Sequence, residues 1–280
     1  MDRLERRGRG RALAEWAIDL IILTDSQSHT ISQISQNRVW DICDKMGDLK
    51  GKDALSKALQ AEEYLASMGS KVCTQLILAS RSPRRRELLS ALGIAFASIV
   101  ADIDESVIPC ETPEALVCRL SFEKARAVAN AFPEATVLGA DTIVVFNQTV
   151  LGKPRSEAEA IAMLKTLRGH RHEVLTAVTL CQGTLPPLQR LNRSHVWMRA
   201  YSDEEIIQYV ASGDPLDKAG AYAIQHEQFQ PVVRWEGCYA SIVGLPLGEV
   251  AVLLRQIGWH VATQVSEACR RVTGKPCCQH

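Results

Sequence analysis

Three consecutive arginines, Arg84–Arg86, follow a Ser-Pro pair at the expected start of a helix. The apolar run 76–79 predicts a short buried strand, and Ser82 with Pro83 predicts the N-cap and first position of the next helix. The first turn of a helix carries the positive end of its dipole, so each cation there costs a few tenths of a kcal/mol to about 1 kcal/mol. A bound anion removes this cost.

Helical geometry predicts the direction of each arginine. Leu88 and Leu89 mark the buried face, and Arg85 precedes them by three and four residues, so Arg85 points inward toward the end of the sheet. Arg84 and Arg86 lie to either side, because successive helical residues are about 100° apart.

The arginines and their neighbours have two interpretations. Their guanidinium groups, the free backbone N–H groups and the hydroxyls of Ser80 and Ser82 together form a site typical of phosphate binding. Alternatively, the arginines form a solvated helix face that pairs with Glu87 and its neighbours.

Composition limits the classes of protein to consider. The chain has 280 residues, 46% of them hydrophobic, which predicts a soluble globular protein with one large α/β domain. Lys plus Arg equals Asp plus Glu at 32 each and only 5% of residues are aromatic, so neither a basic stripe nor a stacking platform for nucleic acid is expected. The nine cysteines include no Cys-x-x-Cys pair and no apolar run approaches about 20 residues, which favours a cytoplasmic protein without a membrane segment or signal peptide.

The chain divides near residue 74. Residues 1–74 form an N-terminal extension of unknown role, partly helical or disordered, with helical patterns at 13–23 and 54–68. Residues 75–258 form the regular domain, and 259–280 form a C-terminal tail. Within the domain, periodicity predicts strands at 76–79, 136–140, 172–180, 195–200, 232–235 and 239–243, with further segments at 96–100 and 141–146. It predicts helices that begin at Ser82-Pro83 and that span 112–130, 156–167, 202–211 and 247–257. This alternation predicts an α/β fold with a mixed sheet.

Asp141 lies between two apolar runs in the stretch VLGADTIVVF. A carboxylate in such surroundings needs a compensating cation or metal. Asp141 is therefore either a neutralised structural acid or a catalytic one.

The stretch ADIDES supplies three acids within four positions, Asp102, Asp104 and Glu105. Carboxylate oxygens suit Mg²⁺ or Mn²⁺, which keep several waters and need only one or two carboxylates. Alternatively, Asp102 and Asp104 are solvated charges of a loop.

Several blocks together resemble the Maf family of nucleotide pyrophosphatases over about residues 76–257. They are Ser80-x-Ser82-Pro83-Arg84-Arg85, Glu105, Glu123-Lys124-Ala125, Gly139-Ala140-Asp141-Thr142, Gly152-Lys153-Pro154, the stretch from Asp217 to Gln225, and Val243-Gly244-Leu245-Pro246. The resemblance implies a mixed twisted sheet with flanking helices in two lobes around a central cleft. It also implies hydrolysis of a nucleoside triphosphate to the monophosphate and pyrophosphate with a divalent metal.

The resemblance also assigns roles to residues. Asp141 matches the family's proton acceptor, and Glu105 matches a functional acid that would share the metal with it. The substrate phosphates are expected to contact six residues: Ser80, Ser82, Arg84, Arg85, Lys124 and Lys153.

Substrate choice is expected to depend on Gln225, Arg84 and Thr142. These residues match the subgroup of the family that cleaves dTTP and UTP, with modified pyrimidine nucleotides as an extension. A Gln amide can pair with the O4 and N3–H edge of uracil or thymine. Residues 226–228, His-Glu-Gln, depart from the glycine-rich pattern of relatives and alter the expected shape of the base pocket.

Two alternatives to this function stay open. One is a pyrophosphatase for another nucleotide, such as 7-methyl-GTP. The other is a non-catalytic protein that binds nucleic acid or regulates division through the helix of Arg84–Arg86, which zero net charge and the buried-looking Asp141 disfavour. The sequence leaves open whether the chain forms a homodimer.

Overall fold

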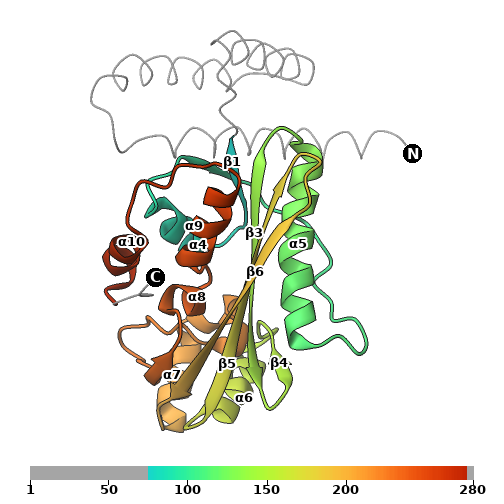
Figure 1. The fold of residues 1–280 in the computed structure, drawn as a ribbon. Coiled ribbons are helices and arrows are strands. Elements are labelled where there is room, and N and C mark those ends of the chain that lie inside the picture. Colours follow the sequence, from blue (N-terminus) through green and yellow to red (C-terminus); the bar gives the residue numbers. More distant parts are fainter. Residues whose placement is uncertain (1–74, 276–280) are drawn as a thin grey trace, which may run out of the picture. The chain divides into compact units, whose positions relative to one another are not determined.

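In the computed structural model of the protein, residues 75–275 are described (Figure 1). The strands are β1 (Leu76–Ala79), β2 (Phe96–Ser98), β3 (Thr136–Phe146), β4 (Thr149–Leu151), β5 (Arg171–Gln182), β6 (Leu188–Met198) and β7 (Val232–Glu236). The helices are α4 (Pro83–Ser90), α5 (Pro113–Ala131), α6 (Glu157–Leu167), α7 (Asp203–Ala211), α8 (Tyr239–Val243), α9 (Leu247–Gln256) and α10 (Val265–Thr273), with two short 3-10 helices, η1 (Asp214–Asp217) and η2 (Ala219–Ala221).

The strands form one seven-stranded mixed sheet in the order β2-β1-β3-β5-β6-β7, with β4 paired to β3. β1 is parallel to β2 and to β3, whereas the pairs β3–β4, β3–β5, β5–β6 and β6–β7 are antiparallel. The long strands β3, β5 and β6 run through both ends of the described unit and connect them (Figure 1).

Helices cover both faces of the sheet. α5 packs on one face, against side chains such as Ile143 and Val145 of β3. α4, α9 and α10 pack on the other face around Leu138 and Ala140, and α6, α7 and η2 form a second core at the opposite end (Figure 1). The expected α/β fold, a mixed sheet with flanking helices in two lobes, is confirmed.

One predicted element is wrong. Residues Tyr239–Val243 form helix α8, not a strand. Four of the five side chains are buried, so the segment shows no polar face from which a helical or strand period could be recognised. Cys238 caps the helix through its sulfur, and Gly244 ends it with a φ of 131°, a backbone conformation that L side chains rarely adopt.

Other elements extend beyond the prediction. The short strand β4 was not expected, and β6 begins seven residues before the predicted strand at His195. The region given as a C-terminal tail contains α10, whose Ala268 and Cys269 are buried in the core around Leu88. The N-terminal extension with its two helical patterns lies outside the described residues.

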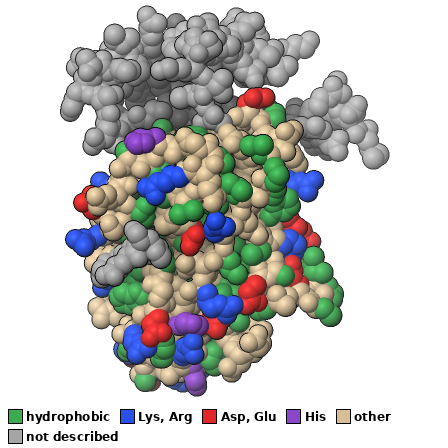
Figure 2. All heavy atoms as spheres, viewed as in Figure 1, with side chains coloured by type: hydrophobic (Ala, Val, Ile, Leu, Met, Phe, Trp, Pro, Cys, Tyr) green, Lys and Arg blue, Asp and Glu red, His purple; other side chains and the backbone are tan. Residues whose placement is uncertain are grey.

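The described surface and helices show two features that bear on binding to nucleic acid and to membranes. On the face shown in Figure 2, basic and acidic side chains are interspersed rather than gathered in one stripe. In the part of the chain that the structure describes, no helix is long and apolar enough to cross a membrane.

Candidate active site

The site forms at a gap in the pairing of β3. β5 pairs with one edge of β3, so β1 and β4 both pair with the other edge. On that edge, the pairing with β1 ends at Gly139 and the pairing with β4 begins at Val144. Residues 140–143 of β3 therefore have no strand beside them on this edge. A cavity of about 1010 Å³ lies against these residues and is lined from both lobes.

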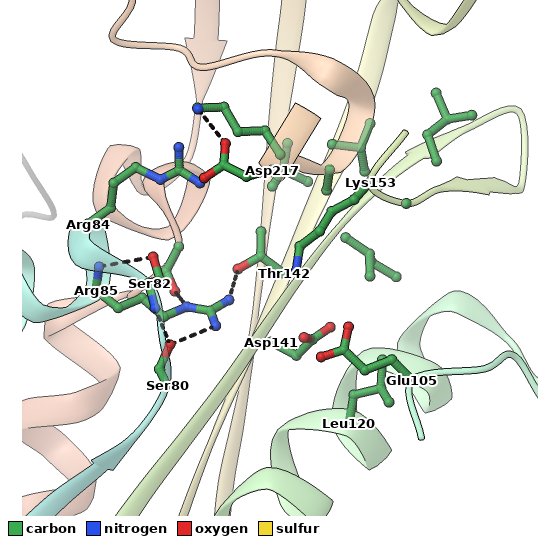
Figure 3. Close-up of a pocket in the computed structure, with 18 of the residues that line it drawn as sticks. Ser80, Ser82, Arg84, Arg85, Glu105, Leu120, Asp141, Thr142, Lys153 and Asp217 are labelled. Carbon is green, nitrogen blue, oxygen red and sulfur yellow. Dashed lines mark hydrogen bonds and ion pairs between the residues drawn. The ribbon is translucent and has the colours of Figure 1, made fainter. Parts of the chain in front are cut away.

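All ten residues to which the resemblance assigns a role line this one cavity, and all of them except Lys124 and Gln225 are labelled in Figure 3. The ten residues come from six segments: Ser80, Ser82, Arg84, Arg85, Glu105, Lys124, Asp141, Thr142, Lys153 and Gln225. The structure thus brings together side chains that lie up to 145 positions apart, from Ser80 to Gln225.

Lys124 joins the two predicted acids. Its Nζ donates to Asp141 Oδ1 at 2.6 Å and lies 2.8 Å from Glu105 Oε1. The side chains of Lys124 and Asp141 are both 10% exposed, whereas that of Glu105 is 49% exposed. Asp141 is therefore a buried carboxylate with a cation as its partner, as the sequence required.

The pKa of Glu105 lies below its ordinary value of 4.5. Burial opposes this shift, but the hydrogen bond and the charge of Lys124 outweigh the burial, with smaller help from Lys153 and Arg85. Glu105 is consequently an anion at neutral pH, and the stability it contributes is lost as the pH falls through this lowered pKa.

Close packing of α5 on β3 places Lys124 beside Asp141. Gly139 makes this approach possible, because a Cβ at that position would lie 2.2 Å from the backbone oxygen of Ser121 and 2.7 Å from the nitrogen of Ala125. α5 itself begins with Thr112 as N-cap and Pro113 at the first position.

The arginine helix begins as predicted, with Ser82 as N-cap and Pro83 at the first position. Arg84 and Arg85 line the cavity and Arg86 does not. Within residues 75–275, none of the three forms an ion pair with Glu87, so the solvated-face interpretation fails for this partner. In Figure 3, Arg84 points toward Asp217 across the cavity.

Arg85 points inward, as predicted, and its guanidinium contacts protein atoms. Nε donates to Gly244 O at 2.8 Å, Nη1 donates to Ala140 O at 2.9 Å, and Nη2 donates to Thr142 Oγ1 at 3.0 Å. Burial lowers the pKa of Arg85, and the charge of Asp141 partly offsets this effect.

Sequence reasoning missed a network that supports Gln225. Lys218 is buried and donates to Asp214 Oδ1 at 2.9 Å and to Asp217 Oδ1 at 2.6 Å. Tyr209 then links Asp214 Oδ2, at 2.7 Å, to the backbone N–H of Ala223, at 3.0 Å. The only signal in the sequence was the Asp217-Lys218-Ala219 block, which carried no assigned role.

His172 and Tyr222 form a second support behind the cavity. His172 Nε2 and Tyr222 Oη are 2.7 Å apart, His172 is 2% exposed, and its Nδ1 has no hydrogen-bond partner. Burial lowers the pKa of His172 to about 3, so the folded protein holds this ring neutral.

This histidine predicts a loss of stability in mild acid. The unfolded chain binds a proton at His172 below pH 6.5 and the folded protein does not, so the free energy of unfolding falls by about 1.4 kcal/mol per pH unit. Between pH 6.5 and pH 5 we expect His172 to lower the free energy of unfolding by about 2 kcal/mol. Urea unfolding of the wild type and of His172→Gln at both pH values measures it, and an equal pH dependence of the two proteins contradicts it.

Three comparisons relate the chain to known proteins. A family model described as Maf-like protein matches residues 75–257. The dTTP/UTP pyrophosphatase of Geobacillus sp. (strain WCH70) is 43% identical over 185 residues, which cover 66% of this chain and 99% of the relative. That of Myxococcus xanthus (strain DK1622) is 49% identical over 185 residues, covering 66% and 93%.

A solved structure, the Ham1 protein of Staphylococcus aureus, is 15% identical with a TM-score of 0.41 and covers 66% of this chain and 100% of its own. The family model spans well over half of the chain and contains all ten predicted site residues. The chain therefore belongs to the Maf family.

Proposed function

We propose that this protein hydrolyses nucleoside triphosphates, dTTP and UTP first among them, to the monophosphate and pyrophosphate. The curated relatives named above carry the name dTTP/UTP pyrophosphatase and align over nearly their whole length. The observation that carries the proposal is the buried Asp141–Lys124 pair at the edge of a cavity lined by further cations.

In this proposal, Asp141 is the proton acceptor for the attacking water. Lys124 donates to Oδ1, which leaves the two lone pairs of Oδ2, one to accept the proton of the attacking water and one to contact a metal. A positioned general base contributes about 10² to 10⁴ in rate. Lys124 holds the carboxylate in a fixed orientation, since its Nζ also contacts Glu105 across the cavity.

The triphosphate would bind between the start of α4 and the opposite wall. Arg84 offers a guanidinium, Ser80 and Ser82 offer hydroxyls, and Lys153 offers an exposed ammonium group aimed into the cavity (Figure 3). Cations and helix N-termini that face a transferring phosphoryl group stabilise the charge that develops on it. The dipole conflict at the start of α4 is relieved by this anion.

We propose a divalent metal, Mg²⁺ or Mn²⁺, held by Glu105 and Asp141. Their carboxylates face one another in Figure 3, and within residues 75–275 each has one oxygen without a hydrogen bond or ion pair. Among the described residues, no three Asp, Glu, His or Cys side chains converge, so substrate oxygens and water would complete the shell, as is usual for Mg²⁺. When bound, such an ion neutralises phosphate charge and lowers the pKa of bound water.

Base selection is assigned to Gln225, with Arg84 and Thr142. Gln225 is exposed in the cavity, and the Lys218 network fixes the segment that carries it. Its amide presents a donor and an acceptor side by side, which match O4 and N3–H of uracil and thymine.

Gln225→Glu tests this assignment. The variant replaces the amide donor with an acceptor that faces O4, so kcat/KM for dTTP and UTP should fall about ten- to a hundredfold. CTP presents an amine there and should lose less or gain. Steady-state kinetics with the three nucleotides decide it. A uniform loss for all three would mean that Gln225 holds its loop instead of reading the base.

A panel of nucleoside triphosphates tests the function itself. The full-length protein, with Mg²⁺ or Mn²⁺, is scored for pyrophosphate release from dTTP, UTP, CTP, dATP, dGTP and 7-methyl-GTP. Highest kcat/KM for dTTP and UTP supports the proposal. Highest kcat/KM for 7-methyl-GTP would assign the chain to another substrate, and no release of pyrophosphate from any nucleotide would refute the enzymatic function.

The cytoplasm, where these nucleotides occur, is the proposed location of the protein.

A further inference from the structure

Arg85 occupies the gap beside β3. The turn in the β3–β4 hairpin has two residues with positive φ, Asn147 at 48° and Gln148 at 63°, which is typical of a type I′ turn. In such a hairpin the two residues that flank the turn, here Phe146 and Thr149, form a hydrogen-bonded pair. Along β3, every second residue then points its backbone N–H and C=O groups to the same edge as Phe146. Ala140 and Thr142 are among these residues, so their backbone groups face the unpaired edge. The Nη1 group of Arg85 meets the carbonyl of Ala140 at that edge, at 2.9 Å.

The donors of Arg85 are almost fully used inside the protein. A guanidinium has five N–H groups. Nε–H bonds Gly244 O at 2.8 Å, Nη1 bonds Ala140 O at 2.9 Å and Ser80 Oγ at 3.5 Å, and Nη2 bonds Thr142 Oγ1 at 3.0 Å. One N–H of Nη2 is left for any ligand.

The acceptors of Arg85 belong to three separate segments of the chain. Ser80 follows β1, Ala140 and Thr142 belong to the unpaired part of β3, and Gly244 ends α8. Arg85 packs directly against Gly244, since a Cβ on Gly244 would be in van der Waals contact with Arg85 Nε at 3.4 Å.

A second side chain, Thr176, contacts the Thr142 hydroxyl from the neighbouring strand β5. Thr176 of β5, which is fully buried, donates its one hydroxyl proton to Ser241 O at 2.8 Å, and its Oγ1 lies 3.0 Å from Thr142 Oγ1, from which it can accept a hydrogen bond. Thr176 does not line the cavity, so it cannot contact a ligand there. Arg85 and Thr176 thus hold the Thr142 hydroxyl between them.

We propose that Arg85 is a positioning residue that takes the place of the missing strand and holds residues 140–143, and with them Asp141, against the start of α4. The phosphate-binding cations in this account are Arg84 and Lys153. The inference rests on the proposed function and changes the role that the sequence analysis expected for Arg85. Lysine cannot fill this role, because a single ammonium group lacks the planar fork that reaches three segments.

Arg85→Lys, with Arg84→Lys as the matched control on the same helix, tests the proposal. Three quantities are measured in the full-length proteins: kcat for dTTP, the Kd of inorganic tripolyphosphate by calorimetry, and hydrogen exchange of amides in residues 138–145. Arg85→Lys should lower kcat about 10²-fold through misplacement of Asp141, speed exchange in 138–145 about tenfold, and leave the Kd close to that of the wild type. Arg84→Lys should weaken the Kd and leave this exchange unchanged.

The opposite pattern overturns the proposal. If Arg85→Lys weakens tripolyphosphate binding as much as Arg84→Lys while exchange in 138–145 keeps its wild-type rate, Arg85 is a phosphate ligand. Amide hydrogen exchange and tripolyphosphate binding are both measured without any catalytic reaction. They therefore test the role of Arg85 even if the protein hydrolyses no nucleotide and the proposed function fails.

Thr176→Val provides a second variant in case Arg85→Lys does not fold. It removes one hydroxyl behind the site, and we expect faster exchange in 138–145 and a lower kcat with an unchanged Kd, both restored by Thr176→Ser. Wild-type exchange and kcat in Thr176→Val would show that Thr142 needs no internal support, which contradicts the proposal.

Discussion

Replacing Asp141 with asparagine is expected to lower kcat by about 10²- to 10⁴-fold while nucleotide binding persists. Asparagine keeps the shape of the side chain and an oxygen for Lys124, whose Nζ lies 2.6 Å from Asp141 Oδ1, but its amide cannot accept a proton from water. Single-turnover kinetics with dTTP, together with calorimetric binding of the same nucleotide, separate the chemical step from binding.

Asp104→Asn is the matched control. Asp104 lies one position before Glu105, and its carboxylate accepts the backbone N–H of Ser106 at 2.9 Å in an exposed part of the loop. The control removes one negative charge near the site without touching the cavity, so its kcat should equal that of the wild type. A folded Asp141→Asn protein with unchanged kcat would refute the assignment of the base.

Replacing Lys124 with methionine should cost about 3 to 5 kcal/mol of the free energy of unfolding. The side chain of Asp141 is 10% exposed and relies on Lys124 as its ion-pair partner, so the variant leaves a buried negative charge beside that of Glu105. Glu105 is half-exposed and adds little to this cost, because water screens it. Urea unfolding at pH 7 measures the loss.

The double variant Lys124→Met with Asp141→Asn completes the cycle. Removing the orphaned charge should recover much of the lost stability, so the two substitutions are strongly non-additive. Additive losses would mean that Lys124 stabilises the protein through packing on α5 and not through its contact with Asp141.

Local rules predicted the start of α4 well. Ser82 caps the helix through its own hydroxyl and Pro83 occupies the first position, and both effects depend only on neighbouring residues. The inward direction of Arg85 also follows from helical geometry alone. Its partners do not, because the Gly244 carbonyl that accepts from Nε lies 159 positions away.

The residues of the site were predictable as a set, but their contacts were not. The family blocks selected Glu105, Lys124 and Asp141 separately, whereas their meeting at one Nζ depends on the close approach of α5 at Gly139. The gap beside Asp141 exists because β1 stops at Ala79 and the three-residue β4 resumes the pairing further along. A strand that short has no period to detect.

The products formed from dTTP test the central claim most directly. Full-length protein is incubated with dTTP and Mg²⁺, and the phosphorus-containing species are followed by ³¹P NMR. Cleavage between the α and β phosphates predicts equal amounts of dTMP and inorganic pyrophosphate. Formation of dTDP with orthophosphate, or dTTP and UTP that both stay intact under conditions where the protein is folded, would contradict the account.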